Sequence, residues 1–599
     1  LWVLALPLAV LGGWFAATRV TDRAGLRIFA GVAWALAPTF LTALVDGRPT
    51  GVLVHLLLPW LFHAAVVAHR SWGAAGAASL VFAAVAACSP SLVPALLVLW
   101  VVGLGITLGT AQFRGAVRLL WTPIPALVLF APLAYAHLVD GSLVALLADP
   151  GAIWAGPQAA ADAAGRLALA TGYPTADAAG WAAFQIAPLG AWAAVFSAPL
   201  ALLALGAAVA PRWRAGITLL VVSLAGFVTA FLAVGVTVSF AQGTPVAIWP
   251  GAGLSLAWIG IVGGAVVTLD TAVTLPRLRT AVTGIAAMAL VVGAVPALTA
   301  LHLDASALRN GPDSTLPAYV AAQASGDQPI STLVLTPQND GGLAAEVVWG
   351  ASETLGAQTT ILSTAEQPRG TDIAALSVDL LSARDFDAPG ELAAHGISYV
   401  LVAQVPGDEA DQARSMRTSA VTAIDQRAGF VHAGTTDRGV LWRVDTDIAA
   451  PATLTNAQEH QARLVVTLQL IFLFAALLLA LPTRASRRAA RAQSRIVGRA
   501  PEEPLVLPRH REELAEASIV EPGGVDELAE AAIVGETPAD ALEEAVAPDG
   551  ETSRNDAESR GEAVDAPTGD AAVDDDAADS TGDPDTEEQQ RRSEEHTSE

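Results

Sequence analysis

An apolar segment followed at once by an arginine cluster limits what this chain can fold into more than any other feature. Residues 464–483 hold 20 residues without a charge. As a helix, such a segment can cross the hydrocarbon core of a bilayer, which is about 30 Å thick. Six arginines follow between Arg484 and Arg499. Because arginine-rich flanks stay on the cytoplasmic side, we expect the preceding residues outside the cell and the following ones inside.

The composition indicates an integral membrane protein. The 599 residues are 53% hydrophobic and only 15% charged, whereas soluble chains are about 25% charged. The net charge of −25 arises after residue 500, where 31 acidic residues face 6 arginines, so residues 1–500 carry 27 charges of each sign. The charge therefore does not identify a ligand of the membrane part, and no nucleic-acid partner is expected. Cys88 is the single cysteine, which excludes a disulfide within the chain.

Apolar runs of spanning length recur along the chain and predict about eleven transmembrane helices. They cover residues 1–17, 26–45, 52–68, 72–88, 91–111, 119–138, 191–210, 215–240, 252–269, 280–301 and 464–483. Proline and glycine inside several of them are tolerated where neighbouring helices satisfy the freed backbone groups. The alternative for residues 252–269 is a re-entrant hairpin.

The connecting segments give an independent orientation. Counted back from the arginine cluster, each segment that is expected inside carries arginine: Arg19, Arg23, Arg27, Arg70, Arg114, Arg118, Arg212, Arg214, Arg277 and Arg279. The outer segments carry only Arg48 and Arg166 before residue 302. This bias supports an odd number of spans and a cytoplasmic C-terminus in the plasma membrane.

The sequence predicts four regions. Residues 1–301 form a polytopic membrane region of about ten helices, with a long outer loop at 139–190 whose alanine-rich middle favours a short surface helix. Residues 302–463 form an extracytoplasmic α/β domain, with strands expected at 331–337, 397–403 and 439–445 and a helix ending at Gly396. Residues 464–483 are the last span. Residues 484–599 are a basic, then acidic, disordered cytoplasmic tail.

Both ends of the sequence carry further expectations. The chain begins inside an apolar run without a basic n-region or a small-residue cleavage site, so we expect a piece of a longer protein rather than a signal peptide. Residues 592–599, RSEEHTSE, match a translated sequencing adapter and are left out of functional reasoning. The acidic tail is expected to be a solvated segment, with a cytoplasmic partner as the alternative.

Candidate chemistry is sparse. Metal-ligand spacings, phosphate-binding loops, dinucleotide fingerprints and nucleophile elbows are all missing from the sequence. The best polar cluster on the outer side is Asp46 and Arg48 in the turn DGRPTG, with His55 nearby and Asp140 and Asp149 after the sixth span. Asp46, Arg48 and Asp149 are the candidate catalytic residues. The plainer interpretation is a polar turn in which Asp46 caps a helix, Arg48 is anchored among headgroups and His55 faces the bundle. Trp60, Trp154, Trp181 and Trp249 fit interfacial anchoring as well as substrate stacking.

Several phrases in order resemble a known family. They are AWALAPTFLTALVDGRPTGVLVHLLLPWLFHAA, PIPALVLFAPL with LLADPG, PGAGLSLAWIG, LVLTPQNDGGLAAEVVWG, and AAHGISYVLVAQ with GVLWRVD. Over residues 1–450 this order resembles the membrane region of large family 2 glycosyltransferases from high-GC Gram-positive bacteria. The resemblance implies an N-terminal catalytic domain that binds a nucleotide sugar and a divalent metal. That domain is missing here, so its ligands cannot be carried over, and no cofactor is expected within this chain.

Three functions follow as expectations. The resemblance implies the membrane portion of a glycosyltransferase in cell-envelope polysaccharide or glycolipid assembly, with membrane lipid and a lipid-linked glycan as partners. One alternative is a GT-C-type transferase that uses polyprenyl-phosphate sugars on the outer face. The other is a non-enzymatic flippase, transporter or scaffold, although internal repeats and mid-membrane charges, which are typical of transporters, are not evident.

Overall fold

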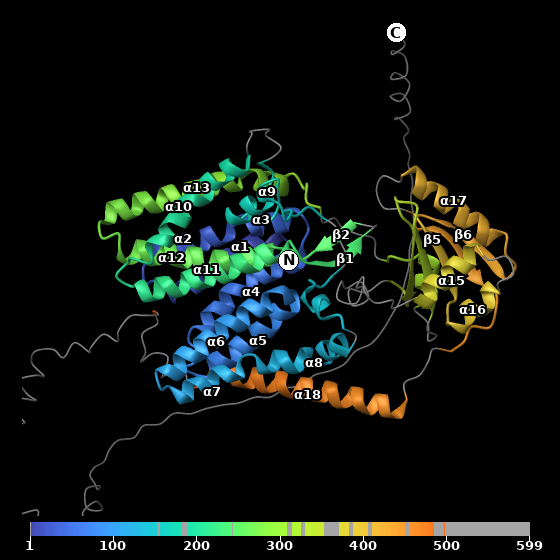
Figure 1. Cartoon of the computed structure of the whole chain (residues 1–599), viewed down its shortest axis with the longest axis horizontal. Helices are drawn as coiled ribbons and strands as arrows, with labels where there is room; N and C mark the ends of the chain where they lie inside the picture. The colour runs from blue at the N-terminus through green and yellow to red at the C-terminus, as the bar shows by residue number, and fades with distance from the viewer. Residues whose placement is uncertain are drawn as a thin grey trace, which may run out of the picture. The chain divides into compact units, whose positions relative to one another are not determined.

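A computed structural model describes residues 2–139, 141–151, 156–181, 189–241, 244–307, 314–324, 330–352, 371–382, 387–404, 410–450, 455–483 and 496. The described part is mostly helical, as the sequence predicts (Figure 1). Up to residue 302 the elements are α1 (Trp2–Ala17), α2 (Ala24–Ala35), α3 (Pro38–Val45), α4 (Pro49–Ala65), α5 (Trp72–Cys88), η1 (Pro90–Leu92), α6 (Val93–Gly109), α7 (Phe113–Trp121), α8 (Ile124–Val139), η2 (Leu143–Leu147), α9 (Ala163–Ala170), α10 (Leu189–Gly206), α11 (Trp213–Ala233), β1 (Thr237–Ala241), β2 (Thr244–Ala247), α12 (Gly251–Thr271) and α13 (Pro276–His302).

After residue 302 the described elements include a second group of helices and strands. They are α14 (Ala318–Ala324), β3 (Ser331–Pro337), β4 (Leu343–Trp349), α15 (Thr371–Ser382), α16 (Ala388–Ala394), β5 (Tyr399–Ala403), α17 (Asp411–Asp425), β6 (Phe430–Thr436), β7 (Gly439–Val444) and α18 (Asn456–Ala480). The predicted tail at 484–599 lies outside the described residues, apart from residue 496.

The described helices include several that can cross a membrane, which indicates a multi-pass membrane protein. Six pass by length and composition, and a seventh does if α2 and α3 count as one bent span. Four further apolar helices are shorter, at 10–17 residues: Trp2–Ala17, Pro49–Ala65, Trp72–Cys88 and Val195–Gly206. Every predicted run therefore overlaps one apolar helix or two consecutive ones, while the full number of eleven crossings stays a prediction.

The expected helix at 26–45 is not continuous. Its two halves, α2 and α3, meet at an angle of 42°. Pro38 begins α3 and has no N–H to donate to the preceding turn, and Ala37 before it leaves the helical region with φ −58° and ψ 128°. Proline disfavours helical geometry in the residue before it, which explains the break. The predicted span at 26–45 is therefore two helices joined by a bend at Pro38.

Helix α12 lies in the centre of the membrane bundle. It runs unbroken from Gly251 to Thr271 (Figure 1), so residues 252–269 form a helix rather than a re-entrant hairpin, and it is buried along nearly its whole length. Small residues let α11 come close: a Cβ built on Gly226 would lie 2.6 Å from the carbonyl oxygen of Gly253. The hydroxyl of Ser223 donates to the carbonyl oxygen of Ala257 at 3.0 Å. Close backbone approach of this kind is a principal source of helix association in lipid.

The connecting segments gather at two ends of the bundle. We call the first the arginine end, made of residues 18–23, 66–71, 110–112, 207–212 and 272–275. There Arg23 and Arg212 share the carboxylate of Asp270 at 2.8 and 3.6 Å, and Arg118 donates to the carbonyl oxygen of Arg70 at 2.8 Å. The second is the Asp46 end, where Ser306 donates to the carbonyl oxygen of Leu44 at 3.1 Å. The arginine-bearing segments predicted to be inside thus meet at one end. That this end faces the cytoplasm stays a prediction.

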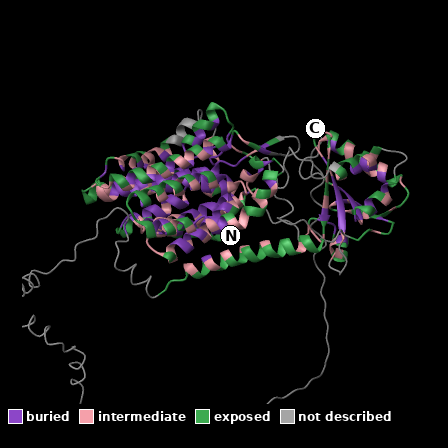
Figure 2. Cartoon of the chain, turned by 60° about the horizontal axis from the view of Figure 1, so that its bottom comes forward, coloured by how far each residue is buried: buried purple, intermediate pink, exposed green. Residues whose placement is uncertain are grey.

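Helix α18 is the most exposed of the long apolar helices, as the green ribbon in Figure 2 shows. It begins in a capping box, in which the Thr455 and Gln458 side chains bond each other's backbone N–H groups. Its last turn packs on α5, where a Cβ on Gly76 would lie 2.7 Å from the backbone nitrogen of Ala480. An apolar face left open in this way is what a helix against lipid presents.

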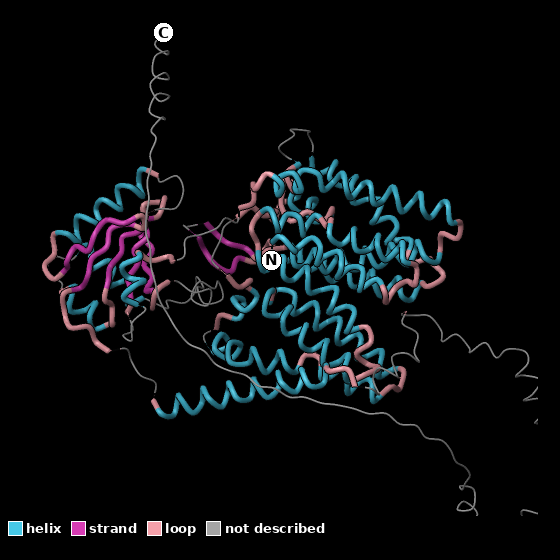
Figure 3. The backbone as a smooth tube through the Cα atoms, turned by 180° about the vertical axis from the view of Figure 1, so that it is seen from behind, coloured by secondary structure: helices cyan, strands magenta, loops and turns pink. Residues whose placement is uncertain are grey.

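The second group of elements contains a small mixed sheet, as predicted (Figure 3). Its described strands run in the order β4-β3-β5-β7-β6, and only the β3–β5 pair is parallel. Leu333 and Val400 pair in register, and both are buried together with Trp442, whose Nε1 donates to Asp425 of α17 at 2.8 Å. The three predicted strands are β3, β5 and β7, and α16 ends before Gly396, which has φ +76°. Strands β4 and β6 were missed. The extracytoplasmic placement of this sheet stays a prediction.

Two further expectations concern the outer loops. The short helix expected within 139–190 is α9. The helix expected at 215–240 ends instead at Ala233, and β1 pairs with β2 as an antiparallel hairpin. Thr237, Val238 and Ser239 form a polar and β-branched run, which favours a strand over a helix. The predicted helix was too long because hydropathy alone does not distinguish an apolar helix from the β-branched strand that follows it.

Candidate functional site

The turn between α3 and α4 places a carboxylate and a guanidinium side by side. Asp46 caps the C-terminus of α3, with its backbone N–H donating to the carbonyl oxygen of Thr42 at 2.8 Å. Gly47 takes the left-handed conformation, φ +67°, which glycine adopts without strain. Arg48 then donates its backbone N–H to Ala43, and Pro49 begins α4. The sequence DGRP thus reverses the chain while leaving both charged side chains at this end of the bundle.

Arg48 lies over an aromatic ring. Its guanidinium carbon is 4.2 Å from the ring centroid of Trp249, which is buried just before α12. A weak hydrogen bond of 3.5 Å joins its Nη2 to the carbonyl oxygen of Pro157. Arginine over the face of tryptophan is a favourable cation–π arrangement. The side chain is therefore held inward against the protein. The plainer interpretation of the turn expected it to extend toward the lipid headgroups instead.

Asp149 is anchored by several donors. The hydroxyl of Ser89 donates to its carboxylate at 3.1 Å, and the Ser91 hydroxyl and the Trp249 backbone N–H donate as well. Ser89 and Ser91 are 2.9 Å apart and flank Pro90, where α5 ends and η1 begins. The proline stops the helix, and the two hydroxyls then point at one acceptor. This set of donors fixes the Asp149 carboxylate in place.

Asp177 is a third carboxylate at the Asp46 end, and its charge acts on Asp46. It follows α9, accepts a hydrogen bond from the hydroxyl of Thr175 at 2.5 Å, and acts on Asp46 as a like charge. We call Asp46, Arg48, Asp149, Asp177 and Trp249 together with Ser89 and Ser91 the carboxylate cluster. Its members come from five separate segments of the chain.

Burial and charge shift the titration of the cluster. Desolvation, then repulsion from Asp177, raises the pKa of Asp46 to about 7, although Arg48 opposes the rise. Desolvation also raises the pKa of Asp149 to about 7, against its hydrogen bonds and Arg48. Burial lowers the pKa of Arg48 to about 10, and both aspartates oppose this. Arginine nevertheless stays protonated at neutral pH, so the cluster holds one fixed cation and two carboxyls that titrate near pH 7.

The two carboxyls differ in their partners. Asp46 Oδ2 is buried without a hydrogen-bond partner among the described residues. Asp149 accepts several hydrogen bonds. A buried carboxylate oxygen without a donor is costly to keep and ready to accept a proton. Asp46 is therefore the better candidate base, and Asp149 is better suited to hold its neighbours in position.

The structure brings together all three candidate residues from the sequence, Asp46, Arg48 and Asp149, while their catalytic role stays a prediction. His55 is separate from them. Its ring is stacked between Trp34 and Phe40, with centroids 3.9 and 4.4 Å away, and bonds Ser255 at 2.9 Å. It is thus a bundle-facing polar residue with satisfied nitrogens. Asp140 lies outside the described residues.

Sequence reasoning missed Ser89, Ser91 and Asp177. A Ser-Pro-Ser run that ends an apolar helix was an available signal for the two hydroxyls. Asp177 lies in a loop whose path back to Asp46 has no local signature. Among the tryptophans, Trp249 belongs to the cluster, and Trp181 donates its Nε1 to the carbonyl oxygen of Gly293 at 2.9 Å. Trp154 lies outside the described residues.

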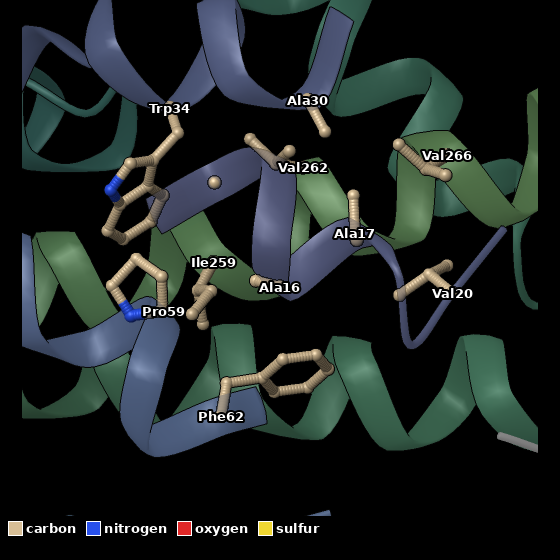
Figure 4. Close-up of a pocket in the computed structure, with 12 residues that line it drawn as sticks. Ala16, Ala17, Val20, Ala30, Trp34, Pro59, Phe62, Ile259, Val262 and Val266 are labelled. Atoms are coloured by element: carbon tan, nitrogen blue, oxygen red, sulfur yellow. The ribbon is translucent and has the colours of Figure 1, made fainter. Parts of the chain in front are cut away.

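Other described sites carry less chemistry. An apolar seam of about 20 Å³ lies where α1, α2, α4 and α12 meet, and Figure 4 shows Trp34, Pro59 and Phe62 around it. This volume is about that of one water molecule, and the lining side chains offer almost no polar partner for it. Within the described ranges no three His, Cys, Asp or Glu side chains are grouped as metal ligands would be.

Comparison with known proteins finds no matching family model, curated protein or solved structure.

Proposed function

We propose that the carboxylate cluster is the reaction site of a glycosyltransferase that takes its sugar from a polyprenyl-phosphate carrier on the outer face of the membrane. The observation that carries the proposal is the position of the Asp46 carboxyl: its Oδ2 is buried next to Arg48, and burial raises its pKa to about 7. The product would enter cell-envelope polysaccharide or glycolipid. The family 2 resemblance also implies cell-envelope glycan synthesis, but with a nucleotide sugar as donor, and the membrane-platform function that it implies stays a prediction.

The proposed step needs one base and one cation. An acceptor hydroxyl attacks the anomeric carbon of the sugar, the bond from that carbon to the phosphate oxygen breaks, and the hydroxyl proton passes to Asp46. The lipid phosphate leaves with the electron pair of the broken bond. A base works best when its pKa lies near the operating pH, which the raised pKa of Asp46 provides.

Arg48 suits the leaving phosphate. A guanidinium pairs with phosphate oxygens through parallel hydrogen bonds, and its charge offsets the charge that develops as the bond breaks. Trp249 lies against the Arg48 guanidinium, and Asp149 interacts with its charge. Asp149 is itself fixed by Ser89. These are positioning roles, since they act through Arg48 rather than on the sugar.

A pH profile tests the proposal. The full chain is reconstituted in liposomes with radiolabelled polyprenyl-phosphate hexoses or pentoses and synthetic glycan acceptors. Asp46 is a base only when ionised, so kcat/KM should rise about tenfold per pH unit below pH 7 and level off above it. Asp177→Asn removes a like charge that raises the pKa of Asp46, so the rise should move to lower pH. Arg48→Gln should move it to higher pH and lower the plateau.

Two outcomes would contradict this function. A profile that keeps its midpoint in Asp177→Asn would show that Asp46 is not the titrating base. Passage of the labelled lipid across the bilayer without transfer to any acceptor would favour the flippase alternative. In that case the cluster would recognise the lipid-linked sugar without reacting with it.

A further inference from the structure

A second cavity opens at the arginine end, the opposite end of the bundle from the carboxylate cluster. Its volume is about 420 Å³, within the range of about 300–1,000 Å³ that is usual for small-molecule sites. Helices α4, α6, α7 and α11 and the segments beside them line it. Its walls are largely apolar, with Phe62, Val66, Ile106 and Leu219 among the lining residues.

Cationic side chains meet at this cavity. Arg19, Arg212 and Arg214 line it together with His69, and none of its described lining residues is acidic. Arg19 donates to the carbonyl oxygen of His63 at 3.2 Å, and Arg212 donates to the carbonyl oxygen of Val20 at 2.8 Å. These bonds to backbone carbonyl oxygens hold the two guanidinium groups in place at the cavity.

One carboxylate, that of Asp270, pairs with an arginine that lines the cavity. Asp270 pairs with Arg212 at 3.6 Å and with Arg23 at 2.8 Å, so one negative charge serves two arginines. Arg118 and Arg70, which flank His69, add further positive charge. The positive-inside bias accounts for arginines in these segments. This bias does not explain why three arginines line the same apolar cavity.

We propose that this cavity binds one anionic phospholipid of the surrounding leaflet. The phosphate lies against Arg19, Arg212 and Arg214, and an acyl chain runs along Phe62, Val66 and Ile106. Guanidinium groups match phosphate oxygens in geometry and charge, and basic pockets between membrane helices hold such headgroups. The lipid ties together α4, α6 and α11, which contribute its lining. This site is independent of the proposed transferase chemistry.

Retention of defined lipids tests the proposal. The full chain is purified, delipidated, supplied with phosphatidylglycerol or phosphatidylcholine, and examined by native mass spectrometry and thermal unfolding. One phosphatidylglycerol should remain bound and raise the melting temperature, whereas phosphatidylcholine should not. Arg214→Gln, at an exposed position, should weaken retention about fivefold. Ala65→Leu keeps every charge but fills part of the cavity, and it should weaken retention too.

A matched control comes from the same end of the bundle. Arg114 is exposed there and does not line the cavity, so Arg114→Gln should retain phosphatidylglycerol as the native chain does. Equal losses in Arg114→Gln and Arg214→Gln would reduce the effect to general surface charge and overturn the proposal. So would equal retention of phosphatidylcholine. Displacement of phosphatidylglycerol by an equimolar polyprenyl monophosphate would assign the cavity to a different lipid.

Discussion

Replacing Asp46 by asparagine is expected to abolish sugar transfer while leaving the fold intact. The amide keeps the size of the side chain but cannot accept a proton, and loss of a positioned general base lowers rates by about 10²–10⁴-fold. Folding should not suffer, because the native carboxyl is held where its ionised form is disfavoured, as its raised pKa indicates. At pH 8 the asparagine variant should therefore unfold at the same temperature as the native chain or higher. Transfer in liposomes and thermal unfolding measure the two effects separately.

The control for this variant lies at the other end of the bundle. Asp22 is exposed there and pairs with Arg27 at 3.3 Å, so Asp22→Asn removes the same charge away from the carboxylate cluster. It should transfer at the native rate. An Asp46→Asn chain that unfolds normally and transfers within tenfold of the native rate would remove Asp46 from the reaction.

A methyl group at Gly226 is expected to disrupt the membrane bundle strongly. The Cβ of alanine there would collide with the backbone of α12, at the nitrogen of Ala257 and, at 2.6 Å, the carbonyl oxygen of Gly253. Backbone atoms cannot move aside as a flexible side chain can, so α11 and α12 must separate. Overpacking usually costs about 1–3 kcal/mol, and this contact should reach the upper end of that range. Thermal unfolding of the detergent-solubilised chain measures the loss.

Gly284 in α13 provides the matched comparison. A Cβ built there meets nothing within 4 Å, so Gly284→Ala adds the same methyl group without a collision. Alanine also favours helix over glycine by about 1 kcal/mol in water, so this variant should be as stable as the native chain or slightly more so. Equal melting temperatures for the two variants would contradict the close approach of α11 and α12.

Local patterns in the sequence were enough to locate most helices and three strands. Strand β3 coincides with the predicted residues 331–337 because an apolar run bounded by turn residues has few other structures open to it. The break at Pro38 and the end of α11 were predicted less well. The helix break and the helix end each depend on a few residues inside an apolar run. Hydropathy averaged over a whole span does not reveal such local changes.

The site was predictable only in part. Asp46 and Arg48 stand out in sequence because they are charged residues in a short turn between apolar runs. Their approach to Asp149 depends on how α5 and α12 pack, since Ser89 and the Trp249 backbone lie at the ends of those helices. Such long-range placement leaves no periodic signal along the chain. The raised pKa of Asp46 likewise arises from burial, which only the assembled bundle creates.

The proposed transferase function requires the carboxylate cluster to face the outside of the cell. Labelling intact cells with a membrane-impermeant maleimide tests this directly. The single native cysteine is first removed as Cys88→Ala, and one cysteine is then introduced at an exposed position. Ala176→Cys lies beside Asp177, and Thr274→Cys lies at the arginine end between α12 and α13. We expect Ala176→Cys to be labelled in intact cells and Thr274→Cys only after permeabilisation, whereas the reverse pattern would contradict the account.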